Sequence, residues 1–142
     1  MRDARQFYIN GAWVAPREGR DLAVLNPSTE EPFATISLGG EADTNAAIAA
    51  AKAAFPAWSR TPRAERAAAL KRLLAAYTAR IDEMAEAISE EMGAPTALAR
   101  DAQATVGQAH IENAIKALEE FTFEYGLDDG ASGTHIIMEP VG

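Results

Sequence analysis

The stretch at residues 62–92 constrains the fold most, because its apolar residues recur at intervals of three and four. This spacing places them on one face of a helix. We expect one long amphipathic helix, with room for a bend, that has Thr61 as its cap and Pro62 in its first turn. Gly93 suits a left-handed helix end, and Pro95 prevents continuation. The apolar face comprises Leu70, Leu73, Leu74, Tyr77, Ile81, Met84, Ala85, Ile88 and Met92.

Such a face needs a partner surface, and the composition indicates that the chain supplies little of one. Apolar residues make up 48% of the 142 residues, but 32 residues are alanine and only 7% are aromatic. Alanine favours helix while burying little surface. We therefore expect a thin hydrophobic core for a chain of this length.

Charge and cysteine content exclude several classes of function. The formal net charge is -8, which argues against nucleic acid and anionic membranes as partners, since both attract basic patches. The sequence has no cysteine, so it offers no disulfide, thiolate metal site or cysteine nucleophile. No apolar run reaches the length of a membrane span, and no signal-peptide core follows Met1. We expect a cytoplasmic location.

The first 40 residues read as short strands. Asn10-Gly11 lies between two aromatic and aliphatic runs, and both residues tolerate positive φ, so residues 7–14 are typical of a β-hairpin. Further strands are expected at residues 22–25 and 33–38, on either side of a turn rich in proline and polar residues. These two or three strands predict a small antiparallel sheet.

The next part, residues 41–125, reads as helical. We expect a helix at residues 41–55 that Pro56 ends, then the helix at 62–92, then one from 97 to about 124 capped by Thr96. Gly107 would permit a break in this last helix. A strand is expected at residues 134–139, after a loop at 126–133. Because the chain stops just after this apolar strand, we expect further protein to follow residue 142, although an edge strand can equally end a domain.

Residue patterns that carry chemistry are few. No glycine-rich dinucleotide loop, P-loop or nucleophile elbow is present, and the run Gly130-Ala131-Ser132-Gly133 is too short and too acidic in context to hold phosphate. His110 and His135 fall in different expected elements, so a joint metal site is not predicted. The adjacent acids Glu90-Glu91, Glu119-Glu120 and Asp128-Asp129 fit solvated charge better than a catalytic pair.

Several short motifs, taken in order, give a more specific reading. The chain resembles the N-terminal part of the aldehyde dehydrogenase superfamily, and the resemblance covers essentially its whole length. The matching residues are Phe7-Tyr8-Ile9-Asn10-Gly11-Ala12-Trp13, Leu25-Asn26-Pro27-Ser28-Thr29-Glu30-Glu31, Ala42-Asp43, Ala53-Ala54-Phe55, Trp58-Ser59, Arg63-Ala64-Glu65-Arg66, Glu90-Glu91-Met92-Gly93-Ala94-Pro95 and Glu139-Pro140-Val141-Gly142.

The resemblance implies an α/β parent fold of Rossmann type, of which this stretch supplies helices, a small antiparallel β element and a C-terminal strand. It implies an oxidoreductase that converts an aldehyde to a carboxylic acid with NAD or NADP, through a cysteine nucleophile, a general-base glutamate and an oxyanion asparagine. In the family these three residues lie downstream of the Glu-Pro-Val-Gly motif. We therefore expect residues 1–142 to form an N-terminal portion that carries no catalytic or cofactor-binding residue and is inactive alone, and residues 133–142 to lead into a cofactor domain.

Two weaker site assignments also follow from the resemblance. A monovalent cation in some relatives would correspond to the carbonyl of Val24 or Leu25 and the side chain of Glu91. A solvated acid at a helix end is the simpler and favoured reading of Glu91. The helix with Asn113 and Leu118, followed by Phe121, would lie near an aldehyde tunnel. Ordinary core packing at helical spacing is the simpler reading of Leu118 and Phe121.

The expected partners are the remainder of the dehydrogenase chain, further copies of the subunit and a small aldehyde, with no nucleic acid and no membrane. The strand at residues 135–138 resembles a segment used in subunit assembly, so an isolated chain should self-associate through it. The alternative is a freestanding, non-catalytic helical module whose apolar face binds another protein.

Overall fold

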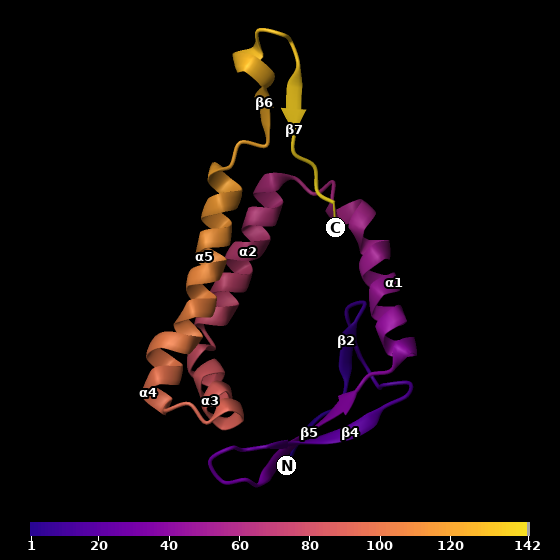
Figure 1. The fold of residues 1–142 in the computed structure, drawn as a ribbon, viewed down its shortest axis with the longest axis vertical. Helices are drawn as coiled ribbons and strands as arrows, with labels where there is room; N and C mark the ends of the chain where they lie inside the picture. Colours follow the sequence, from indigo (N-terminus) through magenta and orange to yellow (C-terminus); the bar gives the residue numbers. More distant parts are fainter. Residues whose placement is uncertain (142) are drawn as a thin grey trace.

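The computed structural model describes residues 1–141. Figure 1 shows an open frame, in which β-strands form the base, one helix rises on one side and a group of helices forms the other side. A β-hairpin projects beyond the second side, at the opposite end from the base. Gly142, the last residue of the Glu-Pro-Val-Gly motif, lies outside the described residues.

The base is a three-stranded sheet in the order β1-β5-β4, built from β1 (Arg2–Ala4), β4 (Arg20–Leu25) and β5 (Pro32–Leu38). Strands β4 and β5 are antiparallel, as expected. Strand β1 was not predicted, and it runs parallel to β5. Its side chains are all exposed, so no apolar alternation marks it in the sequence, and backbone pairing defines it.

The predicted hairpin is confirmed as β2 (Phe7–Ile9) and β3 (Ala12–Val14), which form a separate antiparallel pair. Asn10 has φ 53° and Gly11 has φ 79°, the positive values that a two-residue turn of this kind requires. The Tyr8 and Trp13 rings meet edge to face at 5.3 Å between centroids. The hairpin lies beside the first helix, where Tyr8 and Ile9 share a hollow with alanines of that helix.

Helix α1 (Glu41–Trp58) runs through Pro56, so the expectation that Pro56 ends it was wrong. Helix α1 runs only as far as Trp58 beyond Pro56, and the N–H of Ser59 still donates to the carbonyl of Phe55 at 2.8 Å. Proline this close to the end of a helix therefore removes one bond rather than a series of bonds.

The long helix expected at residues 62–92 is two helices, α2 (Arg63–Thr78) and α3 (Ile81–Met92). They are separated at Arg80, whose φ of -120° and ψ of 21° leave the helical region. The expectation that Thr61 caps this helix was wrong. The Thr61 hydroxyl donates back to the carbonyl of Ala57, and Pro62 occupies the capping position of α2. The left-handed end at Gly93 is confirmed, with φ 69°.

The last helical region also differs from the expectation. It begins with α4 (Thr96–Leu98), widens into the π-helical segment η1 (Ala99–Ala104) and continues as α5 (Thr105–Glu120). The irregularity therefore lies before Gly107 rather than at it. After α5 come β6 (Glu124–Gly126), the 3₁₀ turn η2 (Leu127–Gly130) and β7 (His135–Ile137), with β6 and β7 antiparallel.

The best-buried part of the chain is small and lies where α3 meets η1. It consists of Ala85, Ala99 and Ala104, with Ile81, Ile88 and Ala94 packed around them. Within residues 1–141 no large side chain is fully buried. A compact monomer of this mass exposes about 7,100 Å², whereas this 15.1 kDa chain exposes 10200 Å². The thin core expected from the alanine content is confirmed.

Candidate functional site

The turn after β4 meets the end of α3. A Cβ atom placed on Gly93 would lie 2.9 Å from Cγ of Pro27 and 3.6 Å from Oγ of Ser28, so these two side chains pack closely against the backbone of Gly93. Nearby, Arg2 of β1 pairs with Glu90 of α3 at 3.3 Å. These contacts join the sheet to the second side of the frame, and we call residues 27, 28, 90 and 93 the sheet–helix junction.

The residues expected to bind a monovalent cation lie close in sequence to this junction. Val24 and Leu25 end β4, with an irregular register between them, and the register partner of Leu25 is Pro32, which has no N–H to donate. Glu91 is exposed near the end of α3, and no hydrogen bond joins its side chain to another described residue. Within residues 1–141 no group of three acidic or histidine residues is arranged to hold a metal ion. A site built on backbone carbonyls stays a prediction.

The residues expected near an aldehyde tunnel lie along the second half of α5 and just past its end. Asn113 is exposed and Leu118 is half-buried. At about 100° per residue these two side chains point roughly 140° apart around the helix, so they do not share one face. Phe121 follows the helix, is 49% exposed and packs edge to face on Phe123 at 4.8 Å. The structure thus groups Phe121 with Phe123 rather than with Asn113.

Arg63, to which the sequence assigned no role beyond its place in a family motif, links the start of α2 to the end of α5. Its Nη1 donates to the carbonyl of Phe121 at 3.1 Å and its Nη2 to the carbonyl of Glu119. Its guanidinium also lies 5.4 Å from the centre of the Phe123 ring. Cations suit helix C-termini, but the sequence could not indicate which cation serves which helix.

Asp43 is a second residue of structural importance, which the sequence indicated only as part of the Ala42-Asp43 motif. It is only 5% exposed, and its carboxylate accepts the backbone N–H groups of Arg17 at 2.9 Å and Gly40 at 3.3 Å. The bond from Arg17, followed by those from Gly40 and Glu18, lowers the pKa of Asp43 below its ordinary value. All these donors are backbone groups, so Asp43 fastens the loop after β3 to the start of α1.

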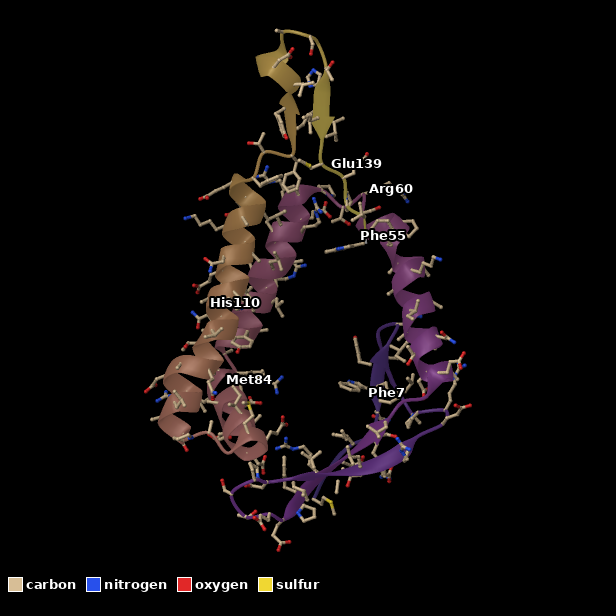
Figure 2. All side chains as sticks on the ribbon, in the orientation of Figure 1. Phe7, Phe55, Arg60, Met84, His110 and Glu139 are labelled. Atoms are coloured by element: carbon tan, nitrogen blue, oxygen red, sulfur yellow. The ribbon has the colours of Figure 1, made fainter. Side chains whose placement is uncertain are left out.

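The two histidines lie in different elements, as predicted. Figure 2 labels His110 on α5, whereas His135 lies in β7 of the projecting hairpin, 3.6 Å from a carboxylate oxygen of Glu124. The glycine-containing run at 130–133 does not fit the diphosphate of a dinucleotide. The carboxylate of Asp128 already accepts the backbone N–H of Ser132 at 3.2 Å and its hydroxyl at 2.9 Å, so negative charge stands where a phosphate would need donors.

Apolar side chains remain uncovered on several elements. On α2 and α3 a hollow of ≈ 750 Å³ is lined by Leu73, Tyr77 and Met84 among others, of which Leu73 is 52% and Met84 is 41% exposed. Side chains of both sides of the frame extend into the space between them (Figure 2). No helix among residues 1–141 is long and apolar enough to cross a lipid bilayer. Large exposed apolar patches are typical of surfaces that pack against further protein.

Comparison with known proteins identifies the family. The family model "Aldehyde dehydrogenase family" matches residues 13–142. A 3-succinoylsemialdehyde-pyridine dehydrogenase from a Pseudomonas species is 42% identical over 143 residues, which cover 100% of this chain and 29% of that protein. The chain thus spans 29% of the length of the curated relatives it matches.

Solved structures agree with this assignment. The crystal structure of an aldehyde dehydrogenase from Bartonella henselae superposes with a TM-score of 0.87 and 47% identity, covering 89% of this chain and 27% of that one. Aldehyde dehydrogenase C from Pseudomonas syringae, solved with NAD⁺ and octanal, gives a TM-score of 0.85 and 40% identity over 87% of this chain and 26% of its own. The expected fold class, a mainly helical part of an α/β parent, is confirmed. The chain belongs to the aldehyde dehydrogenase family.

Proposed function

We propose that residues 1–142 form the N-terminal structural portion of an NAD(P)-dependent aldehyde dehydrogenase that oxidises an aldehyde to a carboxylic acid. The observation that best supports this proposal is the solvent-exposed surface area of the chain. It is 10200 Å², whereas a compact protein of this mass exposes about 7,100 Å². The excess of roughly 3,000 Å² has the size of a large permanent interface. It fits a chain portion whose apolar faces cover the rest of one subunit.

In this proposal the strands at residues 1–40 and the helices at 41–125 pack against the cofactor domain and support the oligomer. Residues 133–142 lead into the cofactor domain. The nicotinamide cofactor would accept hydride elsewhere in the protein. None of the described residues is assigned a chemical step, because the constellation of nucleophile, base and oxyanion donors is not among them. The 142-residue chain is therefore proposed to be inactive by itself.

Several finer properties belong to the same proposal. The cofactor is NAD or NADP, and a relative solved with NAD⁺ and octanal favours NAD and an aldehyde substrate. The enzyme is a cytoplasmic homo-oligomer, in which the exposed Ile137 of β7, at 61% exposure, belongs to a subunit contact. Asn113, Leu118 and Phe121 are proposed to border the aldehyde tunnel.

A monovalent cation is proposed close to the sheet–helix junction, held by the carbonyl of Val24 or Leu25 and the carboxylate of Glu91. The missing N–H of Pro32 supports this, since Leu25 receives no donor from its register partner. Glu91→Gln should reduce the dependence of thermal stability on K⁺ or Na⁺. An unchanged dependence would remove the cation site from the proposal.

The decisive experiment compares the 142-residue chain with the complete protein, meaning the longest reading frame that contains these residues. NADH or NADPH formation at 340 nm is followed with a panel of aldehydes. We expect turnover by the complete protein and none by the 142-residue chain. Turnover by the short chain, or no oxidation of any aldehyde by the complete protein, would overturn the proposal.

The alternative is a freestanding helical module that binds another protein through its apolar face. The uncovered hollow on α2 and α3 is the observation that favours it. A stop codon directly after residue 142 would support this alternative. Continuation of the reading frame into a Rossmann-type sheet and a later cysteine would support the dehydrogenase.

A further inference from the structure

The hollow on α2 and α3 lies where the base of the frame meets its second side. It is lined by Arg2 of the base sheet, by Leu73 and Tyr77 of α2 and by Met84 of α3. Arg80, at which the two helices separate, lines it as well. Three elements therefore contribute to one concave surface, which we call the corner hollow.

The floor of the corner hollow is apolar and uncovered. Leu73 is 52% exposed, Met84 is 41% exposed, and Ala76 is also exposed. A floor this open argues against a small ligand, because ligand pockets enclose about 70–90% of the surface of the molecule they bind. An uncovered apolar floor with a polar rim is typical of a surface that packs against protein.

The rim of the corner hollow is charged, and its two cations are already paired. Arg2 pairs with Glu90 at 3.3 Å, and Arg80 pairs with Glu83 at 2.7 Å. Glu86 also lines the hollow, is exposed and forms no ion pair with another described residue. The rim therefore carries one uncompensated negative charge, which favours an occupant that brings a cation.

The lengths of the relatives indicate which occupant fits best. The chain covers 29% of the curated relatives it matches, so most of such a protein lies outside these residues. A part of the same chain is tethered to the frame and therefore meets the corner hollow at a high effective concentration. A second copy of residues 1–142 would bring a formal net charge of -8 to an acidic rim, which makes it a poor complement.

We propose that the part of the chain that follows residue 142 packs into the corner hollow of its own subunit. It places an apolar side chain between Leu73 and Met84 and a lysine or arginine at Glu86. Because such a segment exists only in the longer dehydrogenase, the inference rests on the proposed function. The occupant excludes water from the floor, so the corner hollow is closed in the complete protein.

The test measures the reactivity of single introduced cysteines, since residues 1–142 have none of their own. Ala76→Cys places a thiol in the corner hollow of the complete protein. Ala75→Cys is the matched control, because it places a thiol about 100° away around α2 and outside the hollow. Both alanines are exposed in this structure. Labelling with N-ethylmaleimide is followed by mass spectrometry of the peptide that contains the variant residue, with urea-unfolded protein as the reference.

The Ala76→Cys thiol should be labelled at least about tenfold more slowly than the Ala75→Cys thiol, because a reagent reaches it only when the covering segment opens. This ratio should stay the same on dilution, since the occupant belongs to the same chain. Equal rates overturn the inference. Protection that is lost on dilution also overturns it, because a second copy is then the occupant. If Ala76→Cys does not fold, Ala87→Cys on α3, which also lines the hollow, replaces it with the same outcomes.

The cation is tested by adding Glu86→Gln to the Ala76→Cys variant. Loss of an ion pair at the rim should raise the labelling rate by about twofold to fivefold. Glu120→Gln is the control, because Glu120 is exposed on α5 and does not line the hollow. Equal labelling rates in the two glutamine variants would overturn the assignment of a cation to Glu86.

The outcomes separate the covered hollow from the proposed function. Turnover of an aldehyde by the complete protein, together with equal labelling of Ala76→Cys and Ala75→Cys, overturns the covered hollow alone. Protection of Ala76→Cys in a complete protein that oxidises no aldehyde overturns the dehydrogenase function and supports the contact. A stop codon directly after residue 142 overturns both.

Discussion

Arg63, the first residue of α2, donates from Nη1 to the carbonyl oxygen of Phe121, the residue that follows α5, at 3.1 Å. The two helices pack side by side, and Lys71 and Glu119 form a second link between them at 2.6 Å. The start of one helix therefore supplies positive charge to the end of its neighbour, where unpaired carbonyls carry partial negative charge.

Arg63→Ala should lower the free energy of unfolding of the complete protein by about 1–2 kcal/mol, because charged hydrogen bonds to two carbonyls are lost. Urea unfolding measures this, and Arg72→Ala serves as the control, since Arg72 is exposed on the same helix. Arg63→Lys should recover part of the loss. Equal stability of the two alanine variants would show that the bonds from Arg63 contribute nothing.

Gly107→Ala tests two opposing effects at one position. Helix propensity alone predicts a gain of about 1 kcal/mol. The contact with Tyr77 predicts a loss of about 1–3 kcal/mol, because the new Cβ would overlap the phenol ring. We expect the loss to dominate in urea unfolding, and we expect Tyr77→Ala to abolish it in the double variant. A stabilised single variant would contradict the close approach.

Gly93→Ala tests the sheet–helix junction, with Gly130→Ala as its control. Both glycines have positive φ, 69° and 85°, but only Gly93 has a neighbour, Pro27, within reach of a Cβ atom. Gly130→Ala should cost about 1 kcal/mol for backbone strain. Gly93→Ala should cost at least about 1 kcal/mol more because Pro27 must move. Equal melting temperatures for the two variants would mean that the junction is looser than the structure shows.

Asp43 should make the protein less stable in acid. Folding lowers the pKa of its carboxyl, chiefly through the N–H of Arg17, so its stabilisation is complete above the ordinary value of 3.8 and is lost as pH falls through the folded value. Asp43→Asn should be less stable than wild type at pH 7, and the difference should shrink below about pH 4. Asp101→Asn, at an exposed residue, is the control. A pH-independent difference would assign the effect of Asp43 to packing instead of charge.

Local sequence signals predicted a large part of the fold. Asn10-Gly11 fixed the β2–β3 hairpin, since these residues adopt positive φ at little cost. Gly93 fixed the end of α3 for the same reason. The family was also readable from short motifs, because their order along the chain needs no knowledge of contacts. The scarcity of large apolar side chains predicted a chain without a complete core of its own.

Features that depend on distant partners were not readable. The pairing of β1 with β5 joins residues far apart in sequence. No local signal marked the separation of α2 from α3 at Arg80 or the π turn of η1. The same holds for the hydrogen bond from the Tyr77 hydroxyl to the Ala104 carbonyl, since no residue near Tyr77 in the sequence indicates Ala104 as its acceptor. Sequence by itself determined most of the helical and strand segments, β1 excepted, because backbone preference and apolar spacing are local. Only the tertiary structure decided where the helices break, which way α5 is turned and which charges meet, because those choices minimise unpaired polar groups between elements.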